Sequence, residues 1–344
     1  MKKKFLFLLL ISIFFVSCND PIFFTVSREL PPLKPIIGGS PSKMVLYSGN
    51  MYVASGKILY SYNGGWSNVR TFSWIRDIAA TSNALYVCHE AGKNGVITNI
   101  FSGEQLAAPG NVNSIFGTPN GPELYLSTSN NNGKFNIYEY NGSSFSLVIS
   151  DVSDLRGAAN DGVNTYICVV NGVYTSSGTA IVNSVGLSFT GIILLPDNSV
   201  FVMSRDGSLR QINTATNELN LPITRLPNSS SGALCIWTDG VNYLLLAGLQ
   251  DINTSINSSD THGYRELELN DTGGITANTG FKWPGASFPT TVSDESRYIS
   301  SIGKHGLNSI FQAPDGVLFA STQQKGLWSY RNRERHGGWQ WNAE

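Results

Sequence analysis

One short pattern, an apolar strand with an aromatic residue at or beside its centre, recurs seven times along the chain and restricts its possible folds. The central residues are Tyr52, Tyr86, Tyr125, Tyr166, Phe201, Leu244 and Phe319. Successive copies are separated by about 34 to 43 positions, apart from one longer interval before the last copy. Self-similarity at a period of roughly 20 to 50 residues is typical of propellers, solenoids and repeat arrays.

Each copy also contains the elements of a small antiparallel sheet. A strand of small or aliphatic residues, such as 157–159, precedes a polar turn such as 160–162, and the aromatic strand follows. The Gly, Asn and Asp residues of these turns favour tight hairpins with positive φ. A third strand of alternating character, such as 137–140, and a short fourth segment, such as 145–148, complete the copy.

Four hairpin-linked strands per copy favour a β-propeller over a solenoid. We therefore predict an all-β fold in which residues 43–344 form a β-propeller of seven four-stranded antiparallel blades. Six or eight blades remain as alternatives, because a degenerate copy could lie between Gly248 and Tyr298. The stretch from Leu249 to His262 is rich in Asn, Ser and Thr, so we expect an exposed loop there.

The last copy, from Leu307 through Asp315 and Gly316 to Tyr330, resembles the propeller repeat of bacterial two-component sensors. The resemblance is clearest in this copy and more diffuse over the other six. It implies a propeller fold and a role in ligand sensing, although no histidine kinase domain follows the last copy in this sequence.

The first 17 residues are typical of a secretory signal peptide, because three lysines precede an apolar run over residues 5–16. This run is too short to cross a bilayer, which takes about 20 residues. Residues 16–18 resemble the lipobox of bacterial lipoproteins, although Phe15 stands where the familiar motif has Leu. The resemblance implies that Cys18 is acylated after cleavage. An ordinary signal peptide with an incidental Cys is the alternative.

Residues 18–42 contain five prolines and are predicted to form an extended tether between the lipid and the propeller. Two or three acyl chains on Cys18 would hold the protein firmly at a membrane. We therefore expect an exported, lipid-anchored monomer of a bacterial envelope. It would face the periplasm or the cell surface, and we favour the outer membrane.

The sequence offers no recognisable catalytic or metal-binding motif. Its four His are scattered singly, and HExxH, CxxC and phosphate-loop patterns are absent from the sequence, so we predict no catalytic residue, metal or cofactor. A net charge of −1 argues against binding to nucleic acid. Exported proteins often pair their cysteines, but the repeat places Cys88, Cys168 and Cys235 too far apart for a bridge. We expect them to be buried, unpaired thiols.

A column of polar residues precedes the repeated aromatic by 10 to 13 positions, at the start of each predicted inner strand. Its members are Ser42, Arg76, Asn113, Arg156, Thr190, Ser231 and Asn308. These similar offsets imply equivalent positions in every blade, which predicts a ring at one mouth of the central channel. The two arginines could bind an anionic or sugar-like ligand through their forked donors. Capping of strand ends and contact with channel water is the alternative role.

These features favour a lipid-anchored, non-enzymatic scaffold that binds a protein or glycan partner through the loops on one face. Two alternatives stay open. One is an envelope enzyme, a lyase or hydrolase with its site at the channel mouth, and the other is a scaffold for outer-membrane assembly.

Overall fold

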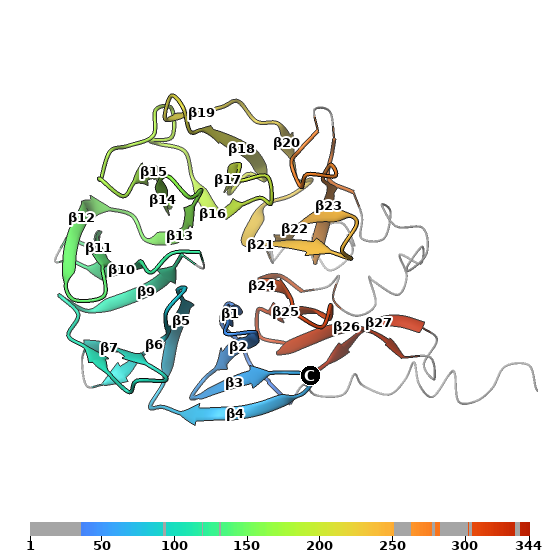
Figure 1. Ribbon diagram of the computed structural model, residues 1–344, viewed down its shortest axis with the longest axis horizontal. Coiled ribbons are helices and arrows are strands. Elements are labelled where there is room, and N and C mark those ends of the chain that lie inside the picture. The colour runs from blue at the N-terminus through green and yellow to red at the C-terminus, as the bar shows by residue number, and fades with distance from the viewer. Residues whose placement is uncertain are drawn as a thin grey trace, which may run out of the picture. The chain divides into compact units, whose positions relative to one another are not determined.

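Seven antiparallel sheets are arranged in a ring, which confirms the predicted seven-bladed β-propeller (Figure 1). In this computed structural model the described residues are 36–91, 94–118, 120–130, 132–250, 263–276, 279–282, 302, 305–333 and 338–344. No helix occurs among them. Cys18, the predicted signal peptide and most of the predicted tether lie outside the described residues.

Blades one, two, three and seven each have four strands in the order of the sequence. Blade one comprises β1 (Val45–Tyr47), β2 (Asn50–Ser55), β3 (Ile58–Tyr62) and β4 (Trp66–Thr71). Blade two comprises β5 (Ile75–Ala80), β6 (Leu85–Ala91), β7 (Asn94–Asn99) and β8 (Gln105–Leu106). Blade three comprises β9 (Val112–Gly117), β10 (Leu124–Ser129), β11 (Phe135–Tyr140) and β12 (Phe145–Val152). Blade seven comprises β24 (Leu307–Gln312), β25 (Leu318–Thr322), β26 (Leu327–Arg333) and β27 (Gly338–Ala343).

The other three blades depart from the predicted four strands. Blade four has β13 (Leu155–Asn160), β14 (Thr165–Val169) and β15 (Gly172–Thr175). Blade five has β16 (Phe189–Leu194), β17 (Val200–Ser204), β18 (Ser208–Asn213), β19 (Glu218–Leu219) and β20 (Thr224–Arg225), the last of which also pairs with β18. Blade six has β21 (Ser230–Thr238), β22 (Tyr243–Leu249) and β23 (Tyr264–Glu268) within the described residues.

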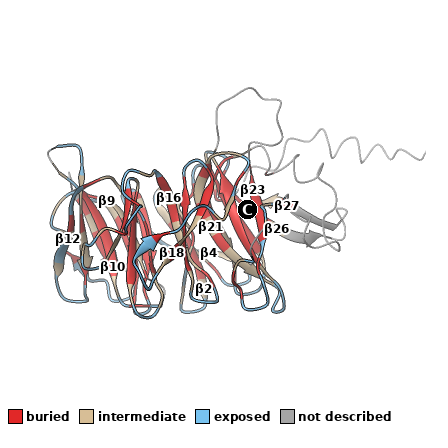
Figure 2. Cartoon of the chain, turned by 90° about the horizontal axis from the view of Figure 1, so that it is seen from above, coloured by how far each residue is buried: buried red, intermediate tan, exposed pale blue. Residues whose placement is uncertain are grey.

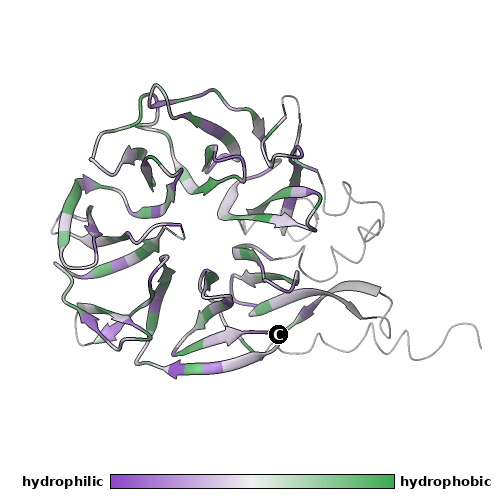
Figure 3. Cartoon of the chain, viewed as in Figure 1, coloured by the Kyte–Doolittle hydropathy of each residue, from purple (hydrophilic) through white to green (hydrophobic). Residues whose placement is uncertain are grey.

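The hydrophobic core lies between neighbouring blades. The first strand of each blade lies next to the ring axis (Figure 1). The repeated residue of the second strand is buried in every blade, with an exposure between 0% for Phe319 and 7% for Tyr86. Tyr86 of blade two, for example, shares a cluster with Val112 and Leu126 of blade three. Buried residues therefore run along the strands while the turns are exposed (Figure 2), and hydrophobic stretches recur in every blade (Figure 3).

The polar turns between first and second strands adopt the conformation that their residues favour. Gly162 and Gly240 have φ values of 91° and 92°, in the left-handed region that glycine tolerates best. In blade four, Asp161 Oδ1 also accepts the Asn164 amide at 2.7 Å. Such Asx turns satisfy backbone groups locally.

The ring closes between the segment before β1 and blade seven. The Ile37 amide donates to the Glu344 carbonyl at 2.7 Å, and the Leu327 amide donates to the Ile37 carbonyl at 2.9 Å. Ile37 is fully buried. The sequence places the start of the propeller at residue 43, whereas these bonds tie residues from Ile37 onward to the last blade.

The predicted loop from Leu249 to His262 is only partly described. Leu249 is the last residue of β22 and is fully buried, so the loop does not begin there as predicted. Its side chain packs in the cluster between blades five and six. Residues 251–262 lie outside the described residues.

Candidate functional site

The polar column predicted from the sequence lies at one end of the inner strands. Ser42 precedes β1, and the other six members are the second residues of β5, β9, β13, β16, β21 and β24. The pairing register shifts at or beside this residue in all six strands, for example between Ile75 and Asp77. Such a β-bulge leaves the extra residue unpaired and re-aims its side chain. The column is therefore a recurring bulge at the start of the inner strands.

Most members of the column make local contacts that support the ring. Arg76 reaches into blade three, where its Nη1 donates to Asn111 Oδ1 at 2.8 Å and to the Val112 carbonyl at 2.9 Å. Asn308 Nδ2 donates to Ser40 Oγ at 2.9 Å, which links blade seven to the segment before blade one. Three further members form hydrogen bonds with nearby backbone groups, namely Ser42, Thr190 and Ser231.

Arg156 differs from Arg76 although the two occupy equivalent positions. Its side chain is exposed, and its guanidinium has no hydrogen-bond or ion-pair partner among the described residues. The residue ahead of β9 is Asn111, which provides the acceptor that holds Arg76. The residue ahead of β16 is Ser188, and Arg156 forms no hydrogen bond with it.

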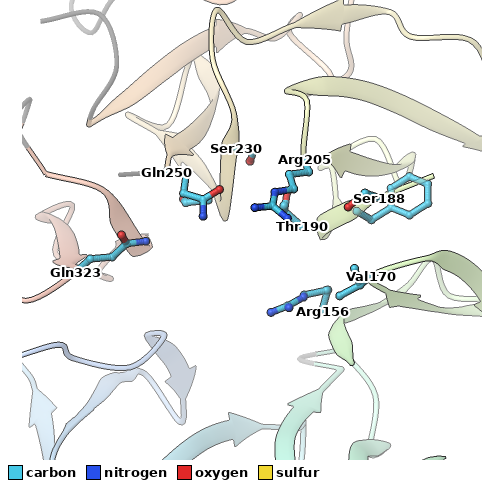
Figure 4. Close-up of a pocket in the computed structure, with 10 residues that line it drawn as sticks. Arg156, Val170, Ser188, Thr190, Arg205, Ser230, Gln250 and Gln323 are labelled. Atoms are coloured by element: carbon cyan, nitrogen blue, oxygen red, sulfur yellow. The ribbon is translucent and has the colours of Figure 1, made fainter. Parts of the chain in front are cut away.

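Three members of the column line one cavity of about 260 Å³ at the centre of the ring. Arg156, Thr190 and Ser231 contribute to it from blades four, five and six. Ser42, Arg76, Asn113 and Asn308 do not line it. The structure thus places part of the predicted column, but not all seven residues, around a single cavity (Figure 4).

A second set of residues, which the sequence prediction missed, completes the lining. Arg205, Gln250 and Gln323 follow the second strands of blades five, six and seven, and they extend into the same space (Figure 4). Their amides donate to carbonyls ahead of the inner strands, as from Arg205 to Ser188 at 2.7 Å. Arg205 and Gln323 stand four positions after a repeated aromatic, so the same counting would have found them.

The cavity has a cationic character without a compensating acid. Arg156 and Arg205 are both exposed, and neither side chain has a hydrogen-bond or ion-pair partner in the described part of the chain. Among the described residues, no Asp or Glu lines the cavity, whose other polar groups are Ser, Thr and Gln. Guanidinium groups bind carboxylate, sulfate or phosphate through paired donors. The arrangement is suited to an anionic group.

Because the side chains of Arg156 and Arg205 have no partners among the described residues, removing their charges should hardly affect folding. We expect the variant Arg156→Gln/Arg205→Gln to unfold within about 0.5 kcal/mol of the wild type. Arg76→Gln, the matched control, loses two hydrogen bonds to blade three and should cost about 1 to 2 kcal/mol. Urea unfolding at neutral pH measures both. Equal losses would contradict the distinct roles assigned to Arg156 and Arg76.

Next to the inner strands, a largely buried ion pair links three blades. Lys43 Nζ lies 2.9 Å from Asp77 Oδ2, and it also donates to the Ile115 carbonyl. The same carboxylate accepts the Ile115 amide at 3.0 Å. The Lys43 ammonium stands 3.4 Å from the centre of the Phe116 ring. Burial lowers the pKa of Lys43 even though Asp77 favours its charged form.

The opposite end of the inner strands has a different chemistry. A cavity of about 390 Å³ lies there and is lined largely by apolar side chains, among them Ile193, Leu234 and Phe311. It contains no Arg, Lys, Asp or Glu. The two cavities therefore differ in polarity, and only the one around Arg156 offers positive charge.

The cysteines of the propeller are buried and unpaired, as predicted. Cys88, Cys168 and Cys235 are free thiols at β6, β14 and β21. Burial raises the pKa of each to about 12. A thiol that stays protonated is a poor nucleophile, so these residues act as small apolar groups.

The buried thiols should make the propeller less stable at alkaline pH. They stay protonated in the folded state up to about pH 12 but ionise in the unfolded chain near pH 9, so rising pH favours unfolding between these values. Each thiol adds up to about 1.4 kcal/mol of lost stability per pH unit in this window. Cys168→Ala/Cys235→Ala should therefore show a shallower decline from pH 9 to 11 in urea titrations. Identical slopes would contradict the burial of these thiols as protonated groups.

Within the described residues, no group of three or more His, Cys, Asp and Glu side chains could hold a metal ion. The same residues include no helix long and apolar enough to cross a membrane. Neither the cavity around Arg156 nor the one around Phe311 includes a His.

Comparisons with known proteins show the fold and no family. No protein-family model matches the chain, and no curated protein matches it. Among solved structures, the extracellular domain of the two component system BT4673 from B. thetaiotaomicron matches with a TM-score of 0.54 at 14% identity. The match covers 87% of this chain and 39% of that one, so this chain spans well under half of that structure.

Two further structures match over nearly their whole length. The WD40 β-propeller domain of Doa1 has a TM-score of 0.53 at 11% identity, with 86% of this chain and 94% of that one covered. YCF48 bound to a D1 peptide has a TM-score of 0.52 at 10% identity, with 87% and 93% covered. At such low identities these likenesses establish the β-propeller fold alone.

Proposed function

We propose that the protein is a non-enzymatic scaffold of the bacterial envelope, which binds an anionic group of a protein or glycan partner at one mouth of its channel. The observation that supports this most strongly is the pair of unpartnered guanidinium groups, Arg156 and Arg205, in a cavity without an acid. Among the described residues, those that line the cavity include no carboxylate, His or Cys that could act as a general base. A binding role therefore fits the cavity better than a hydrolase or lyase.

The solved structures support a binding role by analogy. The names of two matching propellers describe a peptide complex and a checkpoint complex. Another match is an extracellular domain, which is consistent with export. Each of these properties belongs to the matching protein, and the proposal extends them to this chain only in general form.

Anchoring through a lipid on Cys18 is the second part of the proposal, and it rests on the sequence of residues 1–18. We expect Cys18→Ala to abolish incorporation of radiolabelled palmitate and to release the protein from membranes. Ser17→Ala, which keeps the cysteine, serves as the control. Palmitate incorporation that survives Cys18→Ala would contradict the anchor.

The ligand class can be tested with two sugars that differ in a carboxylate. At low ionic strength, galacturonate should bind the soluble propeller and its neutral counterpart galactose should not. Loss of the forked donors in Arg156→Gln/Arg205→Gln should weaken galacturonate binding at least about tenfold, because a charged hydrogen bond contributes about 1.5 kcal/mol or more. Isothermal titration measures these affinities. Equal binding of both sugars, or unchanged binding by the variant, would contradict the proposed site.

A further inference from the structure

A third cavity, which we call the blade-five cavity, adjoins the channel mouth. It measures about 470 Å³ and shares Ser188 and Arg205 with the cavity around Arg156. Arg210 of β18 and Ser204 of β17 contribute to its wall. Ser188 and Arg205 therefore lie between the two cavities, which are adjacent.

Two buried polar atoms of residues that line the blade-five cavity have no hydrogen-bond partner among the described residues. Ser204 is 6% exposed, and its hydroxyl forms no hydrogen bond. Arg210 Nε is likewise buried without an acceptor, although Nη1 of the same residue donates to the Asn220 carbonyl at 3.4 Å. Unsatisfied buried donors are uncommon in folded proteins because each costs free energy. Both atoms belong to residues that line the cavity, but the atoms themselves are closed off from it, so a ligand could satisfy them only after a side-chain rotation.

The charge of the blade-five cavity favours an anion as well. Its one acid, Asp206, already accepts the Ser208 amide at 3.0 Å and lies 3.5 Å from Arg225 Nη2. Burial would raise the pKa of Asp206, but the hydrogen bonds from Ser208 and the charges of Arg225 and Arg210 together hold it below its ordinary value. The carboxylate thus has partners, whereas Arg205 and the Nε of Arg210 do not.

We infer that the cavity around Arg156 and the blade-five cavity form adjacent subsites for one linear ligand with at least two anionic groups. The first group would lie between Arg156 and Arg205, and the second would bind Arg210 and Ser204. This inference rests on the proposed function, since it uses the same channel mouth. The lining between the arginines is rich in hydroxyl and amide side chains, such as Ser188, Thr190 and Gln250. These groups pair well with sugar hydroxyls, so the ligand class is an acidic oligosaccharide.

A length series of oligogalacturonates tests the second subsite. Isothermal titration of the full propeller with one to four linked galacturonate units should show affinity that rises at least about tenfold from the monomer to the trimer. Arg210→Gln should remove this gain while it leaves the affinity for the monomer within about twofold of the wild type. Ser204→Ala should reduce the gain in the same direction. Arg70→Gln is the matched control, because it removes one exposed charge from β4 in blade one. This variant should keep the gain in affinity.

The outcomes separate the two proposals. Monomer binding that depends on Arg156 and Arg205, without a gain from chain length, would overturn the second subsite and leave the proposed function intact. A gain that survives Arg210→Gln would also overturn it. If no galacturonate of any length binds, both proposals are wrong. Tighter binding of a triglutamate peptide than of the trimer would overturn the assignment to an oligosaccharide.

Discussion

Asp77→Ala is expected to lower the free energy of unfolding by about 3 kcal/mol. The substitution leaves the Lys43 ammonium buried without its counter-ion, and loss of one partner of a buried pair costs about 3 to 5 kcal/mol. It also removes the acceptor of the Ile115 amide. We place the effect at the lower end because the two side chains keep 21% and 12% exposure. Urea unfolding at neutral pH gives the value.

The double variant Lys43→Met/Asp77→Ala separates the ion pair from simple loss of packing. Without the charged lysine, the missing carboxylate should cost less, so the double variant should be more stable than the sum of the two single losses predicts. A coupling energy of about 1.5 kcal/mol or more is expected. Strictly additive losses would show that the pair contributes nothing to the link between blades one, two and three.

Gly117→Ala is expected to destabilise the propeller by about 2 to 3 kcal/mol, because the inner strands of blades two and three approach each other closely at this residue. A Cβ on Gly117 would lie 2.6 Å from the carbonyl carbon of Ala80 and closer still to its oxygen. Backbone atoms cannot move aside without separating the strands, and overpacking of this kind typically costs about 1 to 3 kcal/mol. Differential scanning calorimetry and urea unfolding measure the loss.

Gly65→Ala is the matched control for this substitution. Its Cβ would meet no atom within 4 Å, and neither glycine has a positive φ. The control should therefore unfold close to the wild type. Equal stability of Gly117→Ala and Gly65→Ala would contradict the packing of β9 against β5.

The fold could be predicted from the sequence because the signal is local and repeated. A residue such as Tyr166 or Phe201 is buried in every blade, so the period of the aromatic reports the period of the structure. Turn residues such as Gly162 require a backbone conformation that few other residues tolerate. Both signals can be read within one copy of the sequence, although the burial itself comes from packing between neighbouring blades.

The candidate site was predictable only in part, because its chemistry depends on contacts between blades. Counting from the aromatic places Arg76 and Arg156 at equivalent bulges. It does not reveal that Asn111 accepts a hydrogen bond from Arg76, whereas no described residue pairs with the guanidinium of Arg156. Arg205 had a usable signal, four positions after Phe201. The blade-five cavity had none, since the unsatisfied hydroxyl of Ser204 can be recognised only in three dimensions.

The proposed site requires Arg156 and Arg205 to bind an anion together at the channel mouth. The most direct test is a crystal of the propeller soaked in selenate, an oxyanion whose position anomalous scattering reveals. We predict an anomalous peak within hydrogen-bonding distance of both guanidinium groups, and its absence from crystals of Arg156→Gln/Arg205→Gln. Selenate bound elsewhere on the wild-type protein but not in this cavity, or an equal peak in the variant, would contradict the claim.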